Sequence, residues 1–510
     1  MTQVRRNLVT NILSLFVNIF VGIFYTPYLV KTLGVAAYGV IPLSLLLNQY
    51  INILANSLTR AVTRFFSVEY KAGNYRQASA YFTTSIVFTV ILAFILIPVC
   101  CIPIYYLENL LDIPQQLLFS SKWLFVLSVV AFFVSVVCNC VNITIFANNR
   151  LDLINYVKIV RHIAKLFLNV VLFVLFGANL LWVGVAFLLS EIAALIVSIL
   201  VYKKTKQEGV FFSLSLFQPN MVRPIYSMIM WIALISFADT FIYKIDSLLV
   251  TNYFGLESTG MLGSMSEFGS YCISITAIIG SLFSPIILIA YSEGRHLDVK
   301  RLAIDGGFVV GVISCILCGM VMGFSKPILN IWLNEHIAEN FLWMVIKLSV
   351  IPFTTVGAVY ACVYNYWNKV RLPAIISLTI AFLYILLGVL MLEKGVAILP
   401  FLAFNAIAVV AQGFIMNAYI FVSIYKDVRL QIVRNLFRLL LFFFCVYFIC
   451  CGVEYIMPIN SLLQLAVTFL ILGTVIAFGC LFQLKKEEQD MLNLLLPIDS
   501  FLKKLHIKKS

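Results

Sequence analysis

Three charged side chains interrupt an apolar stretch that is long enough to cross a bilayer. The stretch covers residues 228–260, and Asp239, Lys244 and Asp246 lie inside it. A charge near the bilayer centre costs about 2.5–3.5 kcal/mol on insertion scales, so these residues should face a helix bundle or a wet cavity. On a helix Asp239 and Asp246 share one face, whereas Lys244 points elsewhere. They predict either the lining of a transport path or ion pairs that hold helices together.

The composition is typical of a polytopic membrane protein. Of the 510 residues 62% are hydrophobic and 11% are charged, whereas soluble proteins average about 45–50% and about 25%. The first apolar run follows Arg5 and Arg6 and has no small-residue cleavage site, so it predicts a retained helix rather than a signal peptide. The 12 cysteines lie in apolar runs. They predict buried thiols, with no metal set and no cofactor.

The hydrophobic pattern predicts an all-α fold with about 14 transmembrane helices. The predicted crossings are residues 8–30, 36–58, 81–104, 122–146, 155–177, 179–202, 225–250, 258–290, 305–325, 341–366, 372–391, 396–422, 435–453 and 460–484. Their connections are too short to fold as separate domains. Pro285 predicts a kink or an interfacial end in the eighth crossing.

The distribution of positive charge predicts the orientation of the chain. Most of the 35 Lys and Arg residues fall in connections on one side, together with both tails. Because short cytoplasmic loops are enriched in Lys and Arg, both termini are predicted to be cytoplasmic. The net charge of +13 is then a consequence of topology and not a sign of nucleic-acid binding. The predicted outer connections contain only four of the Lys and Arg residues, namely Lys31, Lys122, Lys326 and Lys394.

An internal repeat divides the chain into two six-helix halves of the same orientation. The predicted parts are an N-terminal lobe at 1–203, a C-terminal lobe at 204–422, two appended helices at 423–484 and a cytoplasmic amphipathic tail at 485–510. The tail is predicted to lie on the membrane surface. The repeated residues, 221 positions apart, are Gly34, Gly39, Tyr50, Tyr70 and Gly73 in the first half and Gly255, Gly260, Tyr271, Tyr291 and Gly294 in the second.

Three segments resemble a known family of membrane transporters. They are LVKTLGVAAYG at 29–39, EYKAGNYRQA at 69–78 and YKIDSLLVTNYFGLESTGMLG at 243–263. These segments resemble the bacterial polysaccharide repeat-unit flippases. That family comprises the Wzx-like O-antigen (lipopolysaccharide), capsule and exopolysaccharide translocases of the multidrug/oligosaccharidyl-lipid/polysaccharide exporter superfamily. The helix count and the two halves extend the resemblance over nearly the whole chain.

The resemblance implies a fold, a substrate and partners. It implies two six-helix lobes around a central cavity that opens alternately to each side of the bacterial cytoplasmic membrane. The implied substrate is an oligosaccharide on undecaprenyl pyrophosphate, and the implied partners are the lipid bilayer, a polysaccharide polymerase and glycosyltransferases. In related transporters the last two helices are thought to help accommodate the lipid tail. A monomer is expected.

Basic residues near the predicted inner ends of helices are candidates for phosphate capture. Lys158, Arg161, His162 and Lys165 have the spacing of one helix face. Arginine binds phosphate through two parallel hydrogen bonds, which suits a diphosphate. Anchoring to anionic lipid head groups is the alternative interpretation. Similar pairs four residues apart are Arg60 with Arg64 and Arg434 with Arg438.

Further ionisable residues lie deeper in the predicted crossings, namely Glu191, Glu267 and Lys347. Since a desolvated carboxylate takes up a proton more readily, Glu191 and Asp239 are predicted to take part in proton-coupled switching. Lys244 and Lys347 are predicted to contact acidic sugar or phosphate groups. The charged residues predicted inside the membrane are then four carboxylates and two cations, namely Asp239, Asp246, Glu191, Glu267, Lys244 and Lys347. This excess of carboxylates is consistent with a repeat unit that is neutral or rich in amino sugars.

Three other functions compete with the flippase interpretation. A cation-coupled multidrug exporter of the same superfamily would use an acidic pocket, which Asp239 and Glu191 could supply. A peptidoglycan-precursor flippase would be expected to carry arginines deeper in its first two helices. A membrane polysaccharide polymerase or glycosyltransferase would need a substantial outer loop, but the longest, residues 105–121, has only Glu108 and Asp112 as charged residues. No phosphate-binding GxxxxGK[ST] motif is present, so direct ATP hydrolysis is not expected.

The predicted orientation can be tested by thiol labelling. Single cysteines at positions 31 and 394, in a background silent to the reagent, should react with a membrane-impermeant maleimide added to intact cells. Both positions are in predicted outer connections. Labelling only after the cells are opened would reverse the orientation.

Overall fold

The computed structural model describes residues 3–111, 113–148, 150–204, 210–218, 226–281, 283–367 and 370–495. Throughout these ranges the regular structure is helical and no strand occurs. The chain divides into two compact units, Met1–Gly263 and Ser264–Ser510. These units are defined by contacts within the chain, whereas the predicted lobes are defined by the sequence repeat. The division after Gly263 falls within a long helix. The lobe boundaries themselves stay a prediction.

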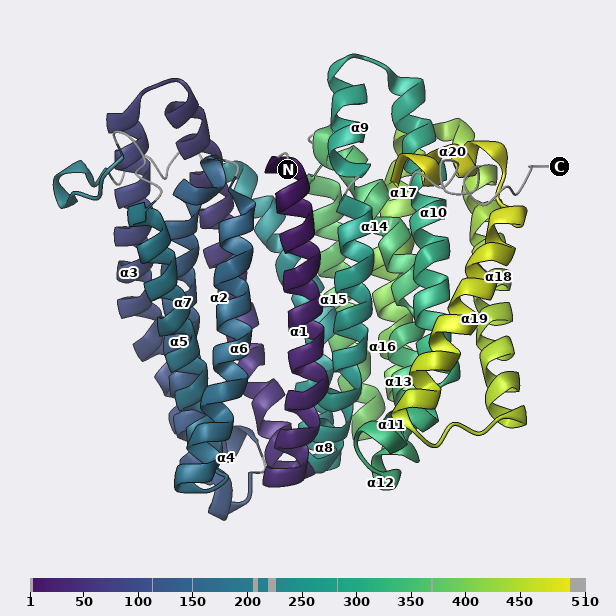
Figure 1. Ribbon diagram of the computed structural model, residues 1–510, viewed down its shortest axis with the longest axis horizontal. Coiled ribbons are helices and arrows are strands. Elements are labelled where there is room, and N and C mark those ends of the chain that lie inside the picture. The colour runs from purple at the N-terminus through teal and green to yellow at the C-terminus, as the bar shows by residue number, and fades with distance from the viewer. Residues whose placement is uncertain are drawn as a thin grey trace. The chain divides into compact units, whose positions relative to one another are not determined.

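The first unit contains seven numbered helices, a short 3-10 turn and the first part of an eighth helix (Figure 1). Most of the long helices run side by side, as expected for successive antiparallel crossings. Their bounds are α1 (Gln3–Leu33), α2 (Val35–Lys71), α3 (Tyr75–Tyr105), α4 (Leu107–Leu110), α5 (Gln115–Ala147), α6 (Leu151–Phe176), α7 (Leu180–Lys204), η1 (Leu214–Leu216) and α8 (Tyr226–Ser281).

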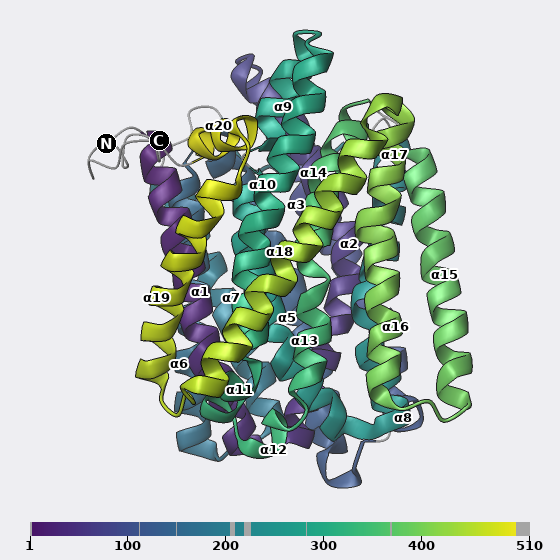
Figure 2. The same cartoon turned by 90° about the vertical axis from the view of Figure 1, so that its right-hand side faces the viewer.

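The second unit begins within α8 and ends with the short helix α20 (Figure 2). The helices are α9 (Phe283–Ser292), α10 (His296–Gly323), α11 (Ser325–Trp332), α12 (Glu335–Ala338), α13 (Phe341–Ser349), α14 (Ile351–Tyr366), α15 (Arg371–Glu393), α16 (Ile398–Val410), the π-helical η3 (Ala411–Met416), α17 (Asn417–Ile424), η4 (Lys426–Val428), α18 (Arg429–Ile456), α19 (Leu462–Gln483) and α20 (Lys486–Leu495).

The helices confirm a polytopic all-α membrane protein. Within the described residues, 11 helical segments are long and apolar enough to cross a membrane. Three further predicted crossings correspond to α2, with 37 residues, and to the two parts of α8, with 56 residues in all. Near Pro285, where the sequence predicts a kink, α8 ends at Ser281 and α9 begins at Phe283.

The repeated glycines have the same backbone conformation in both halves. Gly34 separates α1 from α2 with φ +85°, and Gly255 divides α8 with φ +83°. Gly73 and Gly294 adopt φ +80° and +73° at the turn after the second helix of each half. L-amino acids rarely adopt positive φ, so glycine permits the reversal at these positions. The sequence repeat is therefore also a repeat of backbone geometry.

The second pair of repeated glycines lets α2 and α8 cross closely within the first unit. A Cβ on Gly39 would clash with the carbonyl oxygen of Leu256, and a Cβ on Gly260 would clash with that of Val35. Since Leu256 lies 221 residues after Val35 and Gly260 lies 221 after Gly39, the contact is reciprocal. A reciprocal contact is what a two-fold relation between equivalent helices produces. Small residues at such a crossing allow the two backbones to approach.

In the first unit α5 occupies the centre. It packs against α2, α3 and α7, and 56% of the residues in its most apolar segment are buried. By contrast, α3 lies at the edge, and only 17% of the residues in its most apolar segment are buried. Phe94 of α3 is 78% exposed, as expected for a side chain that faces lipid.

In the second unit the helix equivalent to α3 is covered. This helix is α10, and 78% of the residues in its most apolar segment are buried. Figure 2 shows α18 slanting across the bundle, and α10 packs against α18, α19 and α20. Gly311, Gly319 and Gly323 face α18, where Cβ atoms would lie within 3.1 Å of its side chains. The equivalent residues of α3 include Val90 and Ile102, both exposed. The two helices outside the repeat thus cover the third helix of the second half.

The close crossing of α2 and α8 predicts a strong effect of adding one methyl group. Gly39→Ala should destabilise the protein by about 1–3 kcal/mol, because the new Cβ meets backbone atoms that cannot rotate away. The measurement is thermal unfolding of the purified protein in detergent. Gly452→Ala in α18 is the matched control, since its Cβ meets no atom within 4 Å. Equal stability of the two variants would contradict the close crossing.

Candidate functional site

A polar cavity lies inside the first unit, between α2, α5, α6 and α7. Its volume is about 320 Å³, within the range of about 300–1,000 Å³ that is usual for small-molecule sites. It brings together amides, hydroxyls and charged groups from helices that are otherwise apolar. The lining residues are Leu45, Asn48, Gln49, Asn52, Ser128, Ala131, Phe132, Ser135, Arg161, His162, Lys165, Phe187, Ser190 and Glu191.

An ion pair forms one wall of this cavity. Nε of Arg161 on α6 lies 2.8 Å from Oε2 of Glu191 on α7, and the two side chains are 22% and 17% exposed. Two opposite charges that are mostly removed from water attract each other more strongly than they would on a surface. The pair therefore allows both charges to stay inside an apolar bundle. The pair itself carries no net charge.

Lys165, one helical turn after Arg161, supplies a second cation to the cavity. Its Nζ lies 4.8 Å from the ring centroid of Tyr25 and 4.3 Å from that of Phe187. An ammonium group over aromatic faces is stabilised by the ring quadrupoles. Lys165 is therefore a further cation in the lining of the cavity, beside the Arg161–Glu191 pair. Such a cavity is suited to an anionic group.

The cavity is also lined by amides and hydroxyls from α2 and α5. Asn48 donates from Nδ2 to the carbonyl oxygen of Ser128 at 3.0 Å, and its Oδ1 has no hydrogen-bond partner within the described part of the chain. The Ser128 and Ser135 hydroxyls each donate to a backbone carbonyl of the preceding turn. Their oxygens can still accept hydrogen bonds. Amide and hydroxyl groups at this density can recognise the hydroxyl groups of a sugar.

A buried carboxylate fixes the start of α6, which carries Arg161 and Lys165. The side chain of Asp152 is 0% exposed, lies 2.9 Å from Nε of Arg6 and accepts from Nε of Arg150 at 3.1 Å. It also accepts from Nε2 of Gln3 at 2.8 Å. Since a buried charge with several charge-assisted bonds is costly to move, this network ties α1 to α6. Asp152 is a positioning residue that the sequence analysis did not identify.

The six buried charges predicted for a transport path do not all reach this cavity. Of the six only Glu191 lines it. Asp239, Lys244 and Asp246 lie on α8 in the first unit, with Asp246 buried and the other two half-buried. In the second unit Glu267 is half-buried on α8, and Lys347 on α13 donates to Oδ1 of the buried Asn405 at 2.7 Å. Their roles stay predictions.

Two of the five predicted phosphate-capture residues belong to the cavity, namely Arg161 and Lys165. Lys158 is on the same helix, but it is exposed and does not line the cavity. The side chains of Arg60 and Arg64, on α2, lie outside the described residues.

Three polar residues of α2 were not among the predicted site residues. Asn48, Gln49 and Asn52 all line the cavity. Asn48 and Asn52 are four residues apart inside an apolar crossing, and polar side chains at this spacing share a helix face. This spacing is a signal in the sequence that predicts a polar helix face, although the predicted site residues were all charged.

Comparison with known proteins identifies the fold. No family model matches the chain. The uncharacterised membrane protein EpsK of Bacillus subtilis is 22% identical over 398 residues, which cover 75% of this chain and 76% of EpsK.

Solved structures with the same fold are membrane transporters. An inward-facing multidrug resistance MATE family transporter of the MOP superfamily has a TM-score of 0.68 at 13% identity, covering 84% of this chain and 99% of that one. The lipid II flippase MurJ has a TM-score of 0.61 at 12% identity, covering 98% of this chain and 99% of MurJ. These structures confirm the fold that the resemblance to this superfamily implies.

The Arg161–Glu191 pair predicts a large asymmetry between single and double substitutions. Glu191→Met leaves a mostly buried guanidinium without its carboxylate and should destabilise the protein by about 2–4 kcal/mol. The double variant Arg161→Met/Glu191→Met should recover most of this loss, because no unpaired charge remains. Chemical unfolding in detergent measures both.

Arg295 provides the control, because its ion pairs with Glu293 and Asp298 are on exposed side chains. Arg295→Met should change the free energy of unfolding by less than about 1 kcal/mol. A double variant that is less stable than Glu191→Met would contradict the proposed role of the pair.

Proposed function

We propose that this chain, which has the fold of the multidrug/oligosaccharidyl-lipid/polysaccharide exporter superfamily, flips lipid-linked oligosaccharides across a bacterial cytoplasmic membrane. The proposed substrate is an oligosaccharide repeat unit on undecaprenyl pyrophosphate, moved from the cytoplasmic to the outer leaflet by alternating access. The product would serve surface polysaccharide biosynthesis, whether O-antigen, capsule or exopolysaccharide. Both termini are then cytoplasmic, and glycosyltransferases and a polymerase act before and after transport.

The cavity of the first unit is the observation that carries this proposal. A flippase must shield a sugar and phosphate head group from hydrocarbon while the lipid tail stays in the bilayer. Asn48, Gln49 and Asn52 offer amides to sugar hydroxyls, and Lys165 offers a positive charge. A cavity lined only by aliphatic side chains could not replace the water that such a head group loses.

The ion pair suggests how an anionic head group could enter. Arg161 can exchange Glu191 for a phosphate oxygen, since guanidinium groups bind both anions in the same planar geometry. Glu191 would then be left without its partner, and uptake of a proton would remove its charge. We therefore propose Glu191 and Asp239 as sites of proton coupling. Lys244 and Lys347 are proposed to contact acidic groups of the substrate along the path.

A cation-coupled multidrug exporter is the second candidate, and one observation favours it. The cavity contains a carboxylate, Glu191, close to aromatic rings such as Phe132 and Phe187. Carboxylates and aromatic faces are the groups that bind organic cations. The MATE transporter and MurJ share the fold with this chain at 13% and 12% identity, so fold does not distinguish the two functions.

Transport in reconstituted vesicles tests the proposal. Purified protein should move a fluorescent oligosaccharide-pyrophosphate lipid between leaflets, measured by the loss of access to a membrane-impermeant quencher. An imposed pH gradient should change the initial rate if protons are coupled. Transport of a cationic dye without movement of the lipid would favour the drug exporter and contradict the flippase.

Within this assay Lys165 should be required and Lys158 should not. Lys165→Ala removes the ammonium group from the cavity and should lower the rate of lipid movement at least about tenfold, the loss expected for one charge-assisted contact. Lys158→Ala changes an exposed residue of the same helix and should keep a rate close to that of the unmodified protein. Equal rates for the two variants would remove Lys165 from the site.

A further inference from the structure

A buried amide on α6 has no hydrogen-bond partner. Asn169 is 0% exposed, and neither its Nδ2 nor its Oδ1 makes a hydrogen bond within the described residues. A side-chain amide can donate and accept hydrogen bonds, and leaving them unmade in the interior costs stability. An apolar side chain of similar size would avoid this cost. The amide therefore indicates a position that serves binding rather than folding.

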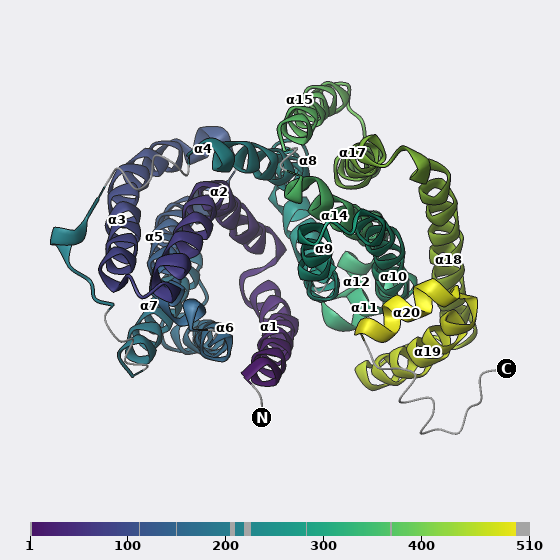
Figure 3. The same cartoon turned by 90° about the horizontal axis from the view of Figure 1, so that it is seen from above.

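A second polar group of this kind lies on α1. Tyr25 is 7% exposed, and its hydroxyl has no hydrogen-bond partner in the part of the chain that the structure describes. Figure 3 shows α6 between α1 and α7, and it packs against both. Along α6, Lys165 lies over the ring of Tyr25, and the ring centroids of Phe173 and Tyr28 are 5.8 Å apart. Since Asn169 is four residues from both Lys165 and Phe173, it shares their face and is turned toward α1.

Lys165 separates these two groups from the polar cavity of the first unit. Lys165 and Phe187 line the cavity, whereas Asn169 and Tyr25 do not. Because Nζ of Lys165 lies over the rings of both Phe187 and Tyr25, its side chain bridges a ring in the cavity wall and a ring behind that wall. A rotation of Lys165 into the cavity would remove this bridge. The buried hydroxyl and amide would then be open to a ligand in the cavity.

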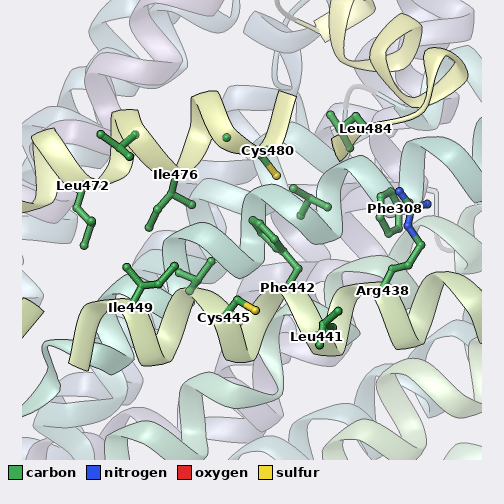
Figure 4. Close-up of a pocket in the computed structure, with 14 residues that line it drawn as sticks. Phe308, Arg438, Leu441, Phe442, Cys445, Ile449, Leu472, Ile476, Cys480 and Leu484 are labelled. Atoms are coloured by element: carbon green, nitrogen blue, oxygen red, sulfur yellow. The ribbon is translucent and has the colours of Figure 1, made fainter. Parts of the chain in front are cut away.

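The cavity of the second unit, between α10, α18 and α19, has a different chemistry (Figure 4). Its volume is about 410 Å³, and its walls are mostly apolar. Arg438, the one charged residue of the described lining, donates to both carboxylate oxygens of Glu488 at 2.6 and 3.0 Å. No amide or hydroxyl side chain is among the described lining residues. A sugar head group therefore finds suitable partners in the first unit's cavity and not in this one.

The hydroxyl of Tyr25 and the amide of Asn169 fit a neutral ligand that is rich in hydroxyl groups. Both groups form hydrogen bonds without carrying a charge, whereas an ion placed between them would lose its water without an opposite charge. Asn169 is one helical turn, about 5.4 Å, beyond Lys165. In a sugar diphosphate the first sugar is bonded directly to phosphate. A phosphate held by Lys165 therefore places that sugar at about the distance of Asn169.

We infer that Asn169 and Tyr25 form a subsite for the sugar next to the diphosphate, and that Lys165 covers this subsite until it turns to bind phosphate. Capture of the phosphate and recognition of the sugar are then coupled, because the cation that binds the anion also uncovers the amide and the hydroxyl. The choice of a sugar as the ligand rests on the proposed function. The existence of a covered subsite rests on the two buried groups and on the position of Lys165 between two rings.

Binding and stability of the purified full-length protein, measured together, test the subsite. Asn169→Leu should weaken binding of the oligosaccharide-pyrophosphate lipid about tenfold, the loss expected for the hydrogen bonds of one amide. It should leave the affinity for sugar-free polyprenyl pyrophosphate unchanged. The temperature of thermal unfolding should not fall, because no partner of the amide loses a hydrogen bond. Tyr25→Phe, which keeps the ring beneath Lys165, should give the same pattern.

Asn142 on α5 provides the matched control. It is also buried, but its Oδ1 accepts from the Ser198 hydroxyl at 2.7 Å, and it does not line the cavity. Asn142→Leu should lower the unfolding temperature and leave both affinities unchanged. If Asn169→Leu lowers the unfolding temperature in the same way and keeps its affinity for the oligosaccharide lipid, the amide has only a structural role and the inference is wrong. An equal loss of affinity for both lipids would also overturn it.

Thiol labelling tests the movement of Lys165. Asn169→Cys, in a background without other reactive thiols, should react slowly with a small polar methanethiosulfonate reagent in the free protein. Sugar-free polyprenyl pyrophosphate should accelerate the reaction several-fold, since phosphate draws Lys165 away from the two rings. Lys165→Ala should have the same effect without lipid, and the oligosaccharide lipid should protect the thiol. Equal rates in all four conditions would contradict the role of Lys165 as a cover.

The outcomes also separate this inference from the proposed function. If the protein moves the oligosaccharide lipid, but Asn169→Leu and Tyr25→Phe bind that lipid as tightly as the unmodified protein, the inference is wrong and the proposed function stands. If the protein neither binds nor moves the oligosaccharide lipid, both are wrong.

Discussion

The structure depends on how charged side chains are accommodated among apolar helices. A charge that reaches hydrocarbon without a partner is strongly unfavourable, so each one must find an opposite charge, a polar group or water. Arg161 lies against Glu191, Asp152 binds Arg6 and Arg150, and Lys347 donates to Asn405. Because most of these contacts join different helices, the charges help to fix how the helices pack.

The two halves follow one plan but have different surroundings. In each half a glycine with positive φ starts the second helix, and the pair Gly39 and Gly260 allows a reciprocal helix crossing. The third helices then differ, since α3 exposes bulky apolar residues and α10 carries glycines against α18. In the second unit α18, α19 and α20 thus cover the helix that is equivalent to the exposed α3. These helices also enclose a cavity with mostly apolar walls, and Arg438 of α18 is among its lining residues.

The sequence predicted the fold well because its signals are local or periodic. Apolar length predicts crossings, and glycines at a constant separation of 221 residues predict the repeat. The cavity was predicted only in part. Arg161 and Lys165 were predicted as basic residues near the inner end of a helix and Glu191 as a deeper carboxylate, but the pairing of Arg161 with Glu191 depends on how α6 packs against α7. The sequence alone does not give that packing.

Other contacts gave weaker signals or none. Asn48 and Asn52 have the spacing of a polar helix face and could have been recognised. The bond between Arg438 and Glu488 joins residues 50 positions apart, and nothing in either segment indicates the partner. Pairings between distant ionic residues are set by tertiary packing, whereas helix ends and turns are set by the residues themselves.

Photo-crosslinking in living cells tests most directly whether the cavity of the first unit holds the substrate head group. A photoreactive amino acid at position 52 lies in that cavity, and one at position 94 lies on the exposed face of α3. We expect a sugar-bearing lipid adduct at position 52 and only phospholipid adducts at position 94. Phospholipid adducts alone at both positions, in cells that make the polysaccharide, would contradict it.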